Sequence, residues 1–271
     1  MLTHLETSPT LPPKYLQDDK LTQECFWHPA KQLQGVIACQ KHFEAQNSDI
    51  FLVTTPKYGT TWLKAIVFAL VKRMHYRRGM ENHPLFRNNP HDLVPFLDLK
   101  IYVENKTPDL SSFASPRLFA THLPFNSLPK SCTMLHARLL FKNPKDTFVS
   151  IWHFSNKLRL IGNMETNSLE DVLDRFCKGV SNYGPFWDHV LGYWKESLEN
   201  PNKEEFLTLC SFGNLRNLEV NKSGKLSSGE ENEAYFRRGE VGDWKNFLTA
   251  EMVDRINSLA EEKFGASRLK L

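Results

Sequence analysis

The sequence predicts an α/β protein in which a parallel sheet lies between layers of helices. Two short, mainly apolar runs, residues 50–54 and 138–141, are each followed by a turn and a helix-forming segment. Such runs are typical of parallel strands that are buried on both faces. The alternation of strand, turn and helix favours a sheet with helices on both sides.

The composition is that of an ordinary globular protein. The 271 residues suffice for one large domain or two small ones. The 41% apolar and 24% charged residues exclude collagen-like, disordered and disulfide-scaffold proteins. Because 34 basic residues face 31 acidic ones, the net charge of +3 is too small for a nucleic-acid-coating protein. Any anion site must therefore be local.

The cysteines and the N-terminal segment indicate a cytoplasmic protein. The five cysteines include no CxxC pair, so we predict neither a zinc site nor a disulfide framework. Residues 1–20 contain three prolines but no apolar core, and we expect a disordered lead-in rather than a secretory signal. The longest apolar run, residues 65–71, is too short to span a membrane, so no membrane partner is expected.

The strand at residues 50–54 and the helix after it are the clearest elements. The helical segment begins at Thr60 and is apolar almost all round apart from Lys64, which predicts a buried helix packed on the sheet. Residues 118–120 are expected to form another strand, which ends at residues 121–124.

The C-terminal half is expected to contain further helices. Pro144 suits the first position of a helix after the strand at 138–141, because a proline there loses no helical hydrogen bond. Apolar residues at helical spacing predict a last helix from near Thr249. Residues 200–205 and 221–233 are polar and rich in turn formers, so we expect surface loops there.

The turn before the helix at Thr60 can bind phosphate. N–H groups at a helix start point outward at the positive end of the helix dipole, and Gly59 lets the chain approach an anion closely. Lys57 adds a positive charge, and the hydroxyls of Thr60 and Thr61 add hydrogen-bond donors. The lysine precedes the glycine by two residues, unlike the standard nucleotide loop. A capped strand-to-helix turn without a ligand is the alternative.

His122 follows the strand at residues 118–120. Open α/β sheets bind ligands outside the carboxyl ends of their strands, and a neutral histidine there can accept a proton from a hydroxyl. A structural or merely exposed histidine is the alternative.

Two further groups of residues suit phosphate. Lys142 and Ser150 lie eight residues apart across a strand-to-helix turn, where a cation and a hydroxyl can meet a second phosphate. Arg237 and Arg238 stand beside Gly239, and guanidinium groups in a flexible segment can clamp phosphate oxygens. Taken alone, each group is equally explained as solvated surface.

In this order, the four segments resemble the cytosolic sulfotransferases, and most of all the plant members that act on small hydroxylated molecules. The resemblance extends over residues 26–264. Residues 56–62, Pro-Lys-Tyr-Gly-Thr-Thr-Trp, resemble the family's 5′-phosphosulfate loop. Residues 237–239 with 242–245 resemble its C-terminal cofactor motif, and residues 143–154 agree as well.

The resemblance implies a single domain over residues 21–271 that uses 3′-phosphoadenosine 5′-phosphosulfate (PAPS) as sulfonate donor and needs no metal. His122 is then the general base for the acceptor hydroxyl, and Lys57 stabilises charge that develops on the departing phosphate. Lys142 and Ser150 are assigned to the 3′-phosphate and Trp62 to the adenine. The residues implied to hold the cofactor are Lys57, Tyr58, Gly59, Thr60, Thr61, Trp62, Lys142, Ser150, Arg237, Arg238 and Gly239.

The implied acceptor is a small hydroxylated molecule of the flavonoid, steroid, hydroxyjasmonate or desulfoglucosinolate type. Its pocket is expected to be apolar and aromatic. The candidate lining residues, each of which can equally be core, are Phe26, Trp27, Phe86, Phe96 and Tyr102.

The sequence departs from the family pattern at three points. Lys142 stands where arginine is usual, which turns a bidentate phosphate contact into a point charge. A central strand with an adenine-contacting tyrosine is missing near residues 199–210, which suggests an internal deletion. Residues 245–254 match only part of the dimerisation motif of animal relatives, so a homodimer stays open.

Two alternatives to an active sulfotransferase follow. Because the gap removes part of the nucleotide pocket, the chain is alternatively a catalytically weak or inactive nucleotide-binding protein. A nucleotide kinase with an unusual phosphate loop is the other interpretation, and it requires Mg²⁺.

Overall fold

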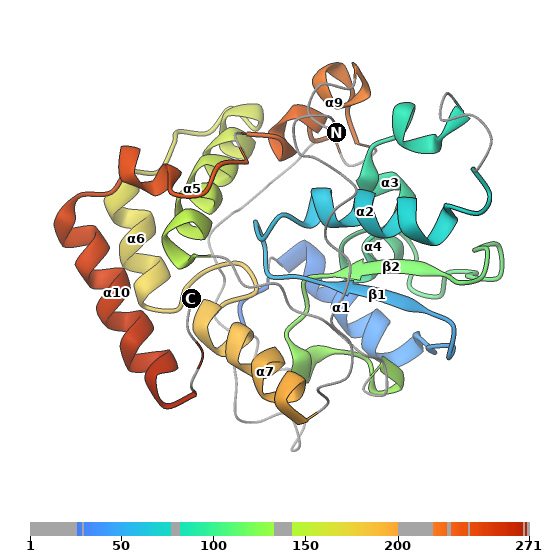
Figure 1. Cartoon of the computed structure of the whole chain (residues 1–271), viewed down its shortest axis with the longest axis horizontal. Coiled ribbons are helices and arrows are strands. Elements are labelled where there is room, and N and C mark those ends of the chain that lie inside the picture. Colours follow the sequence, from blue (N-terminus) through green and yellow to red (C-terminus); the bar gives the residue numbers. More distant parts are fainter. Residues whose placement is uncertain are drawn as a thin grey trace.

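Two parallel strands, β1 (Ile50–Val53) and β2 (Leu118–Thr121), lie side by side in the computed structural model (Figure 1). The structure describes residues 26–28, 30–76, 82–132, 143–199, 219–226, 229–237, 239–267 and 269. The strands are in register from the pair Ile50 and Leu118 to the pair Val53 and Thr121. Their carboxyl ends therefore meet at one edge of the sheet.

Helices form most of the described chain. The α-helices are α1 (Ala30–His42), α2 (Thr60–Lys72), α3 (Pro90–Leu93), α4 (Tyr102–Glu104), α5 (Pro144–Ile161), α6 (Leu169–Cys177), α7 (Phe186–Glu199), α9 (Glu219–Ser223) and α10 (Ala250–Phe264). Shorter helical turns are Pro84–Phe86, Leu97–Ile101, Phe125–Ser127, Lys130–Cys132, Asn232–Tyr235, Asp243–Asn246 and Gly265–Ser267.

Different helices cover the two faces of the sheet, because successive side chains of a strand point to opposite faces. Leu52, Leu118 and Ala120 pack with residues of α2 on one face. Val53 and Phe119 pack with residues of α1 on the other. Figure 1 shows α2 above the strands and α1 below them. The predicted parallel sheet with helices on both sides is confirmed.

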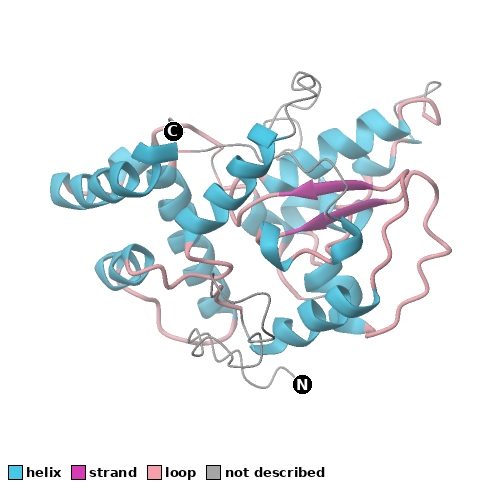
Figure 2. Cartoon of the chain, turned by 90° about the horizontal axis from the view of Figure 1, so that it is seen from below, coloured by secondary structure: helices cyan, strands magenta, loops and turns pink. Residues whose placement is uncertain are grey.

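A second apolar cluster joins the long helices of the C-terminal half. Phe148 of α5, Leu173 of α6, Trp187 of α7 and Ile256 of α10 are buried in it together. Figure 2, seen from below, shows the two strands surrounded by helices. The sheet edge with the strand ends thus lies against a helical layer that the C-terminal half supplies.

A buried ion pair ties the starts of the two strands together. The Nε and Nη2 atoms of Arg117 donate to the Asp49 carboxylate at 2.7 and 2.6 Å. Both side chains are nearly inaccessible, at 7% and 0% exposed. This bidentate contact fixes the residues that directly precede β1 and β2.

The predicted helix starts are confirmed. The helix α2 begins at Thr60, and α5 begins at Pro144 after Asn143, whose side chain accepts from the Lys145 N–H. Thr249 caps α10 in the same way, by accepting from the Met252 N–H. The expected strand at 138–141, the lead-in at 1–20 and residues 200–210 lie outside the described residues. No helix in the described part of the chain is long and apolar enough to cross a membrane.

The expectation of a surface loop over residues 221–233 is wrong in part. The helix α9 covers its start, and Asn221 and Asn232 are buried at 1% and 3% exposed. Each amide is hydrogen-bonded, because Asn89 Nδ2 donates to Asn221 Oδ1 and Asn232 Nδ2 donates to the Val220 carbonyl. Polar composition predicted exposure here, whereas tertiary hydrogen bonds hold both side chains inside the protein, and only Oδ1 of Asn232 has no partner among these amide atoms in the described structure.

Candidate active site

The turn between β1 and α2 has the backbone that an anion site requires. Gly59 precedes α2 with φ of 85°, a conformation that glycine adopts without strain. Gly59 has no side chain that could accept from the first N–H groups of α2, which point out of the helix start. A carbon atom added at Gly59 would meet nothing within 4 Å, so the space beside it is open. The turn therefore fits a phosphate group.

Lys57 lies where three parts of the chain meet. It has φ of 67°, and its Nζ atom is 4.0 Å from the ring centre of Phe154 on α5. The ring centre of Tyr235 is 5.7 Å from the same atom. Contacts of this kind with aromatic faces stabilise the ammonium group. They hold the positive charge of Lys57 between the turn, α5 and the segment before Arg237.

His122 is buried directly beyond the end of β2. Its Nδ1 atom lies 2.5 Å from the carbonyl oxygen of Thr54, the residue that follows β1. A carbonyl oxygen only accepts, so the imidazole hydrogen is on Nδ1 and the Nε2 atom carries the lone pair. The Thr54 hydroxyl lies 2.7 Å from the Thr60 hydroxyl, which links the histidine to the first residue of α2.

Burial keeps the His122 imidazole neutral. It lowers the pKa of His122 to about 3, and electrostatic interactions with Lys64, His189 and Lys57 act in the same direction. The Thr54 carbonyl raises this pKa, but burial outweighs it. The Nε2 atom of His122 is therefore unprotonated, as a proton acceptor must be before transfer.

Aromatic rings flank His122, and of the two rings, Phe96 was a predicted lining residue whereas Tyr183 was not. The Phe96 ring centre is 4.6 Å from that of His122, and the Tyr183 ring is 5.7 Å away. Phe26 is buried against His189, and Tyr102 is buried on the α1 side of the sheet. Phe86 lies on a short turn with its side chain 43% exposed, and its expected place in a pocket stays a prediction.

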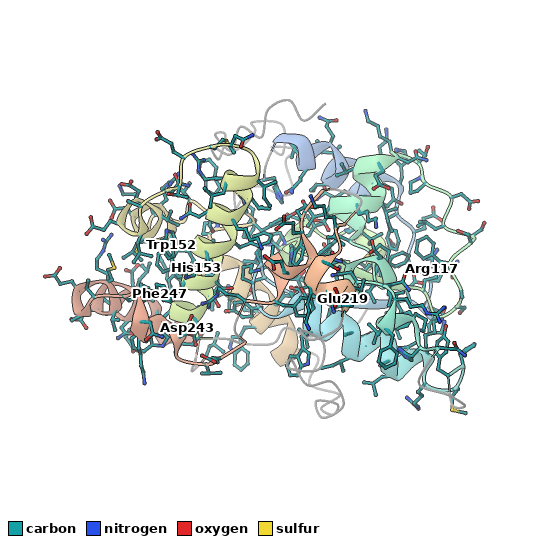
Figure 3. All side chains as sticks on the ribbon, turned by 90° about the horizontal axis from the view of Figure 1, so that it is seen from above. Arg117, Trp152, His153, Glu219, Asp243 and Phe247 are labelled. Carbon is teal, nitrogen blue, oxygen red and sulfur yellow. The ribbon has the colours of Figure 1, made fainter. Side chains whose placement is uncertain are left out.

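The C-terminal motif is tied to the start of α5. The Asp146 carboxylate accepts from the backbone N–H groups of Gly242 and Trp244 at 2.8 and 3.2 Å. Arg237 forms an ion pair with Asp243. Figure 3 shows Asp243 and Phe247 beside Trp152 and His153 of α5, and the Phe247 ring packs against both of those rings.

The remaining cofactor candidates divide into three groups. Ser150 lies on α5, partly exposed, and Gly239 is exposed in the loop before Gly242. Tyr58 is buried against Phe186, and Trp62 packs partly buried on the apolar cluster around α2. Lys142 and Arg238 lie outside the described residues.

A buried polar chain runs from Thr61, a predicted cofactor residue, through His91 to Lys64, and neither His91 nor Lys64 was predicted as a site residue. The Thr61 hydroxyl lies 2.9 Å from Nε2 of His91, and Lys64 Nζ lies 3.1 Å from Nδ1 of the same ring. Lys64 is 0% exposed. Its position as the one charge in an otherwise apolar stretch of the helix was the available signal.

A second unpredicted group surrounds Asp98. Thr121 and Tyr183 donate hydroxyl hydrogen bonds to its carboxylate at 2.8 and 2.9 Å. Burial raises the pKa of Asp98, and these two hydrogen bonds together with Lys64 oppose that shift. Asp98 thereby fixes both the residue before His122 and a ring that contacts His122.

This chain is similar to known sulfotransferases over most of its length. The family model described as a sulfotransferase domain matches residues 47–203 and 198–268. Cytosolic sulfotransferase 15 of Arabidopsis thaliana is 41% identical over 286 residues, covering 90% of this chain and 79% of that protein. Cytosolic sulfotransferase 12 of the same plant is 41% identical over 320 residues, covering 95% and 97%.

Solved structures give the same result for the fold. A crystal structure of an Arabidopsis thaliana protein provisionally assigned as a steroid sulphotransferase has a TM-score of 0.68 and 40% identity, over 92% of this chain and 87% of that one. Mouse sulfotransferase SULT7A1 complexed with PAP has a TM-score of 0.63 at 22% identity, over 91% and 95%.

Proposed function

The chain belongs to the sulfotransferase family, and we propose that it moves a sulfonate group from PAPS to a hydroxyl of a small acceptor with His122 as general base. The observation that carries the proposal is the contact between His122 Nδ1 and the Thr54 carbonyl. Because this contact occupies Nδ1, the lone pair of Nε2 is the one that takes the proton of the acceptor hydroxyl.

PAPS, when bound, supplies the sulfonate group. The open space at Gly59 and the outward N–H groups of α2 support a 5′-phosphosulfate at the turn of residues 56–62. The Lys57 ammonium stands at this turn, where positive charge stabilises a transition state that concentrates negative charge on the departing phosphate. PAP, 3′-phosphoadenosine 5′-phosphate, is the product that PAPS leaves after transfer. Its presence in the mouse structure supports the same nucleotide here.

The other donor contacts are proposals of the same kind. We assign Ser150 and Lys142 to the 3′-phosphate, Trp62 to the adenine, and Arg237, Arg238 and Gly239 to the loop that closes over the nucleotide. The Asp146 contacts with Gly242 and Trp244 support this assignment, because they hold the C-terminal motif against the helix that carries Ser150. Tyr58, Gly59, Thr60 and Thr61 supply the phosphosulfate turn itself.

The acceptor is proposed to be a small, ring-containing hydroxylated molecule of the flavonoid, steroid, hydroxyjasmonate or desulfoglucosinolate type. Phe96 and Tyr183 support this class, because both rings contact the base and offer apolar faces. The provisional assignment of the Arabidopsis structure supports steroids within it. The names of the plant relatives support a cytosolic enzyme.

A catalytically weak or inactive nucleotide-binding protein is the second candidate function. The family model matches the chain in two parts that overlap at residues 198–203, which supports a deletion near 199–210. Loss of a central segment exposes core and removes part of a nucleotide pocket.

Thermal unfolding with and without PAP tests whether the donor site survives. PAP at about 100 times its dissociation constant stabilises a competent protein by about 2.7 kcal/mol, which raises the unfolding temperature measurably. A cooperative transition that PAP does not shift would reject both the transferase and the nucleotide-binding protein. A shift without transfer to any acceptor would favour the second candidate.

A further inference from the structure

Thr61, His91 and Lys64 form a directional chain of hydrogen bonds that ends at the phosphosulfate turn. Thr61 and Lys64 are three residues apart on α2, so they share one side of the helix, and His91 of α3 bridges them. All three residues are buried, at 7%, 6% and 0% exposed for Thr61, His91 and Lys64. Buried polar groups of this kind carry a high cost unless each bond is made.

The donor at one end of the chain sets the direction of every bond. When Lys64 is an ammonium group, which only donates, Nδ1 of His91, 3.1 Å from Lys64 Nζ, accepts. The hydrogen of the neutral ring is then on Nε2, which donates to Thr61 Oγ1 at 2.9 Å. Because the Thr61 oxygen accepts this hydrogen bond from His91, the Thr61 O–H is left to donate to a different group.

Two contacts of Lys64 favour the ammonium form that this direction needs, against the effect of its burial. Lys64 Nζ lies 3.4 Å from the Phe96 ring centre, a contact that stabilises an ammonium. Burial has the larger effect and lowers the pKa of Lys64 well below its ordinary value, whereas the nearby Asp98 carboxylate opposes that shift. Burial and the positive charge of Lys64 lower the pKa of His91 well below its ordinary value, so this imidazole is neutral.

We propose that Lys64 and His91 are positioning residues, which hold the Thr61 hydroxyl as a hydrogen-bond donor toward the phosphosulfate end of PAPS. This inference rests on the proposed function, since that function places the donor at this turn. The opposite direction, with Thr61 donating to His91, would present oxygen lone pairs to an anion and repel it. Lys64 acts through two residues and needs no contact with the ligand.

The test begins with the protein alone. In spectra of ¹⁵N-histidine-labelled protein that correlate ring nitrogens with ring protons, wild-type His91 should carry its hydrogen on Nε2. Lys64→Met removes the group that fixes this tautomer and should produce a mixture or the Nδ1–H form. A wild-type His91 with its hydrogen on Nδ1 overturns the proposal, even if the Lys64 variant does not fold. The ring-nitrogen signal of His91 is assigned as the one that is missing from the spectrum of the His91→Gln variant.

The second part measures PAP affinity in a double-mutant cycle. Because hydrogen bonds to charged groups are among the strong ones, Lys64→Met should weaken PAP roughly tenfold. In a Thr61→Val background the same change should alter affinity by less than about twofold, since coupling vanishes when the shared partner is gone. Lys72→Met, on the last turn of α2, is the matched control and should leave affinity unchanged.

The outcomes separate this inference from the proposed function. If Lys64→Met weakens PAP affinity equally in the wild-type and Thr61→Val backgrounds, the proposed chain of hydrogen bonds is rejected, although PAP binding itself is retained. Absence of PAP binding by the wild-type protein rejects the proposed function and, with it, the ligand assigned to Thr61.

Discussion

The Nδ1 atom of His122 lies 2.5 Å from the carbonyl oxygen of Thr54, so the residue that follows β1 holds the side chain that follows β2. The two strands are paired up to Val53 and Thr121, which brings both residues to the same edge of the sheet. The contact fixes the ring and its tautomer together. It leaves Nε2 as the nitrogen available for proton transfer.

Replacing His122 should abolish transfer while sparing the donor site. His122→Gln keeps an N–H group for the Thr54 carbonyl but has no basic nitrogen, so kcat should fall roughly 10²–10⁴-fold. PAP affinity, measured by calorimetric titration, should change little. His75→Gln, at an exposed histidine, is the control. Near wild-type turnover by His122→Gln would show that His122 is not the general base.

Lys57 should matter for both binding and rate. Lys57→Met removes the positive charge at the turn, so PAP should bind more weakly and kcat should fall roughly 10²–10³-fold, the loss typical of one electrostatic contact. Lys57→Arg keeps the charge and should recover part of the rate. Steady-state kinetics at saturating PAPS separate the two effects. If Lys41→Met, at an exposed position on α1, lowers kcat equally, charge at the turn is not the cause.

Acid should destabilise the fold through its buried histidines. Burial lowers the pKa of His28 to about 4 and those of His122 and His189 to about 3, below the ordinary 6.5. The unfolded chain therefore binds more protons as the pH falls below 6.5. Unfolding free energy is retained above that pH and is lost between pH 6.5 and about 3, by up to about 1.4 kcal/mol per pH unit for each histidine.

Denaturant unfolding between pH 5 and 7 measures this slope. His189→Phe should flatten it by about one proton, whereas His42→Phe, at the exposed end of α1, should not. An unchanged slope in His189→Phe would show that this ring does not contribute to the pH dependence.

The Arg117 and Asp49 pair should be far more important for stability than an exposed pair of the same type. Arg117→Met leaves the Asp49 carboxylate buried without a partner, which typically costs about 3–5 kcal/mol. Arg255 and Asp174 are similarly close, at 2.5 Å, but about half exposed. Arg255→Met should leave the unfolding midpoint nearly unchanged, because water screens that pair. Equal midpoints for the two variants would contradict the role assigned to burial.

Local sequence patterns were sufficient to predict the elements that carry the site. The uncharged run at residues 50–54, Gly59, Pro144 and the cap at Thr249 each act within a few residues, and the structure has the strand, turn and helices there. Patterns of this range depend on backbone preference and capping, which one sequence displays.

The contacts around the site could not be predicted in this way. His122 depends on Thr54, 68 residues away, and Thr61 depends on His91, 30 residues away. The sequence marks Lys64 as unusual in its helix, but its burial becomes visible only once α3 lies against α2. The same reason explains Asn221 and Asn232, whose polar side chains suggest a surface that tertiary hydrogen bonds remove.

The most direct measurement is transfer of radiolabelled sulfonate from PAPS to a panel of flavonoids, hydroxysteroids, hydroxyjasmonates and desulfoglucosinolates by the full chain in the presence of a metal chelator. The account predicts labelled product from at least one acceptor class, with no dependence on Mg²⁺. A protein that unfolds cooperatively and binds PAP yet labels no acceptor would contradict it, and the chain would then be a nucleotide-binding relative of the sulfotransferases.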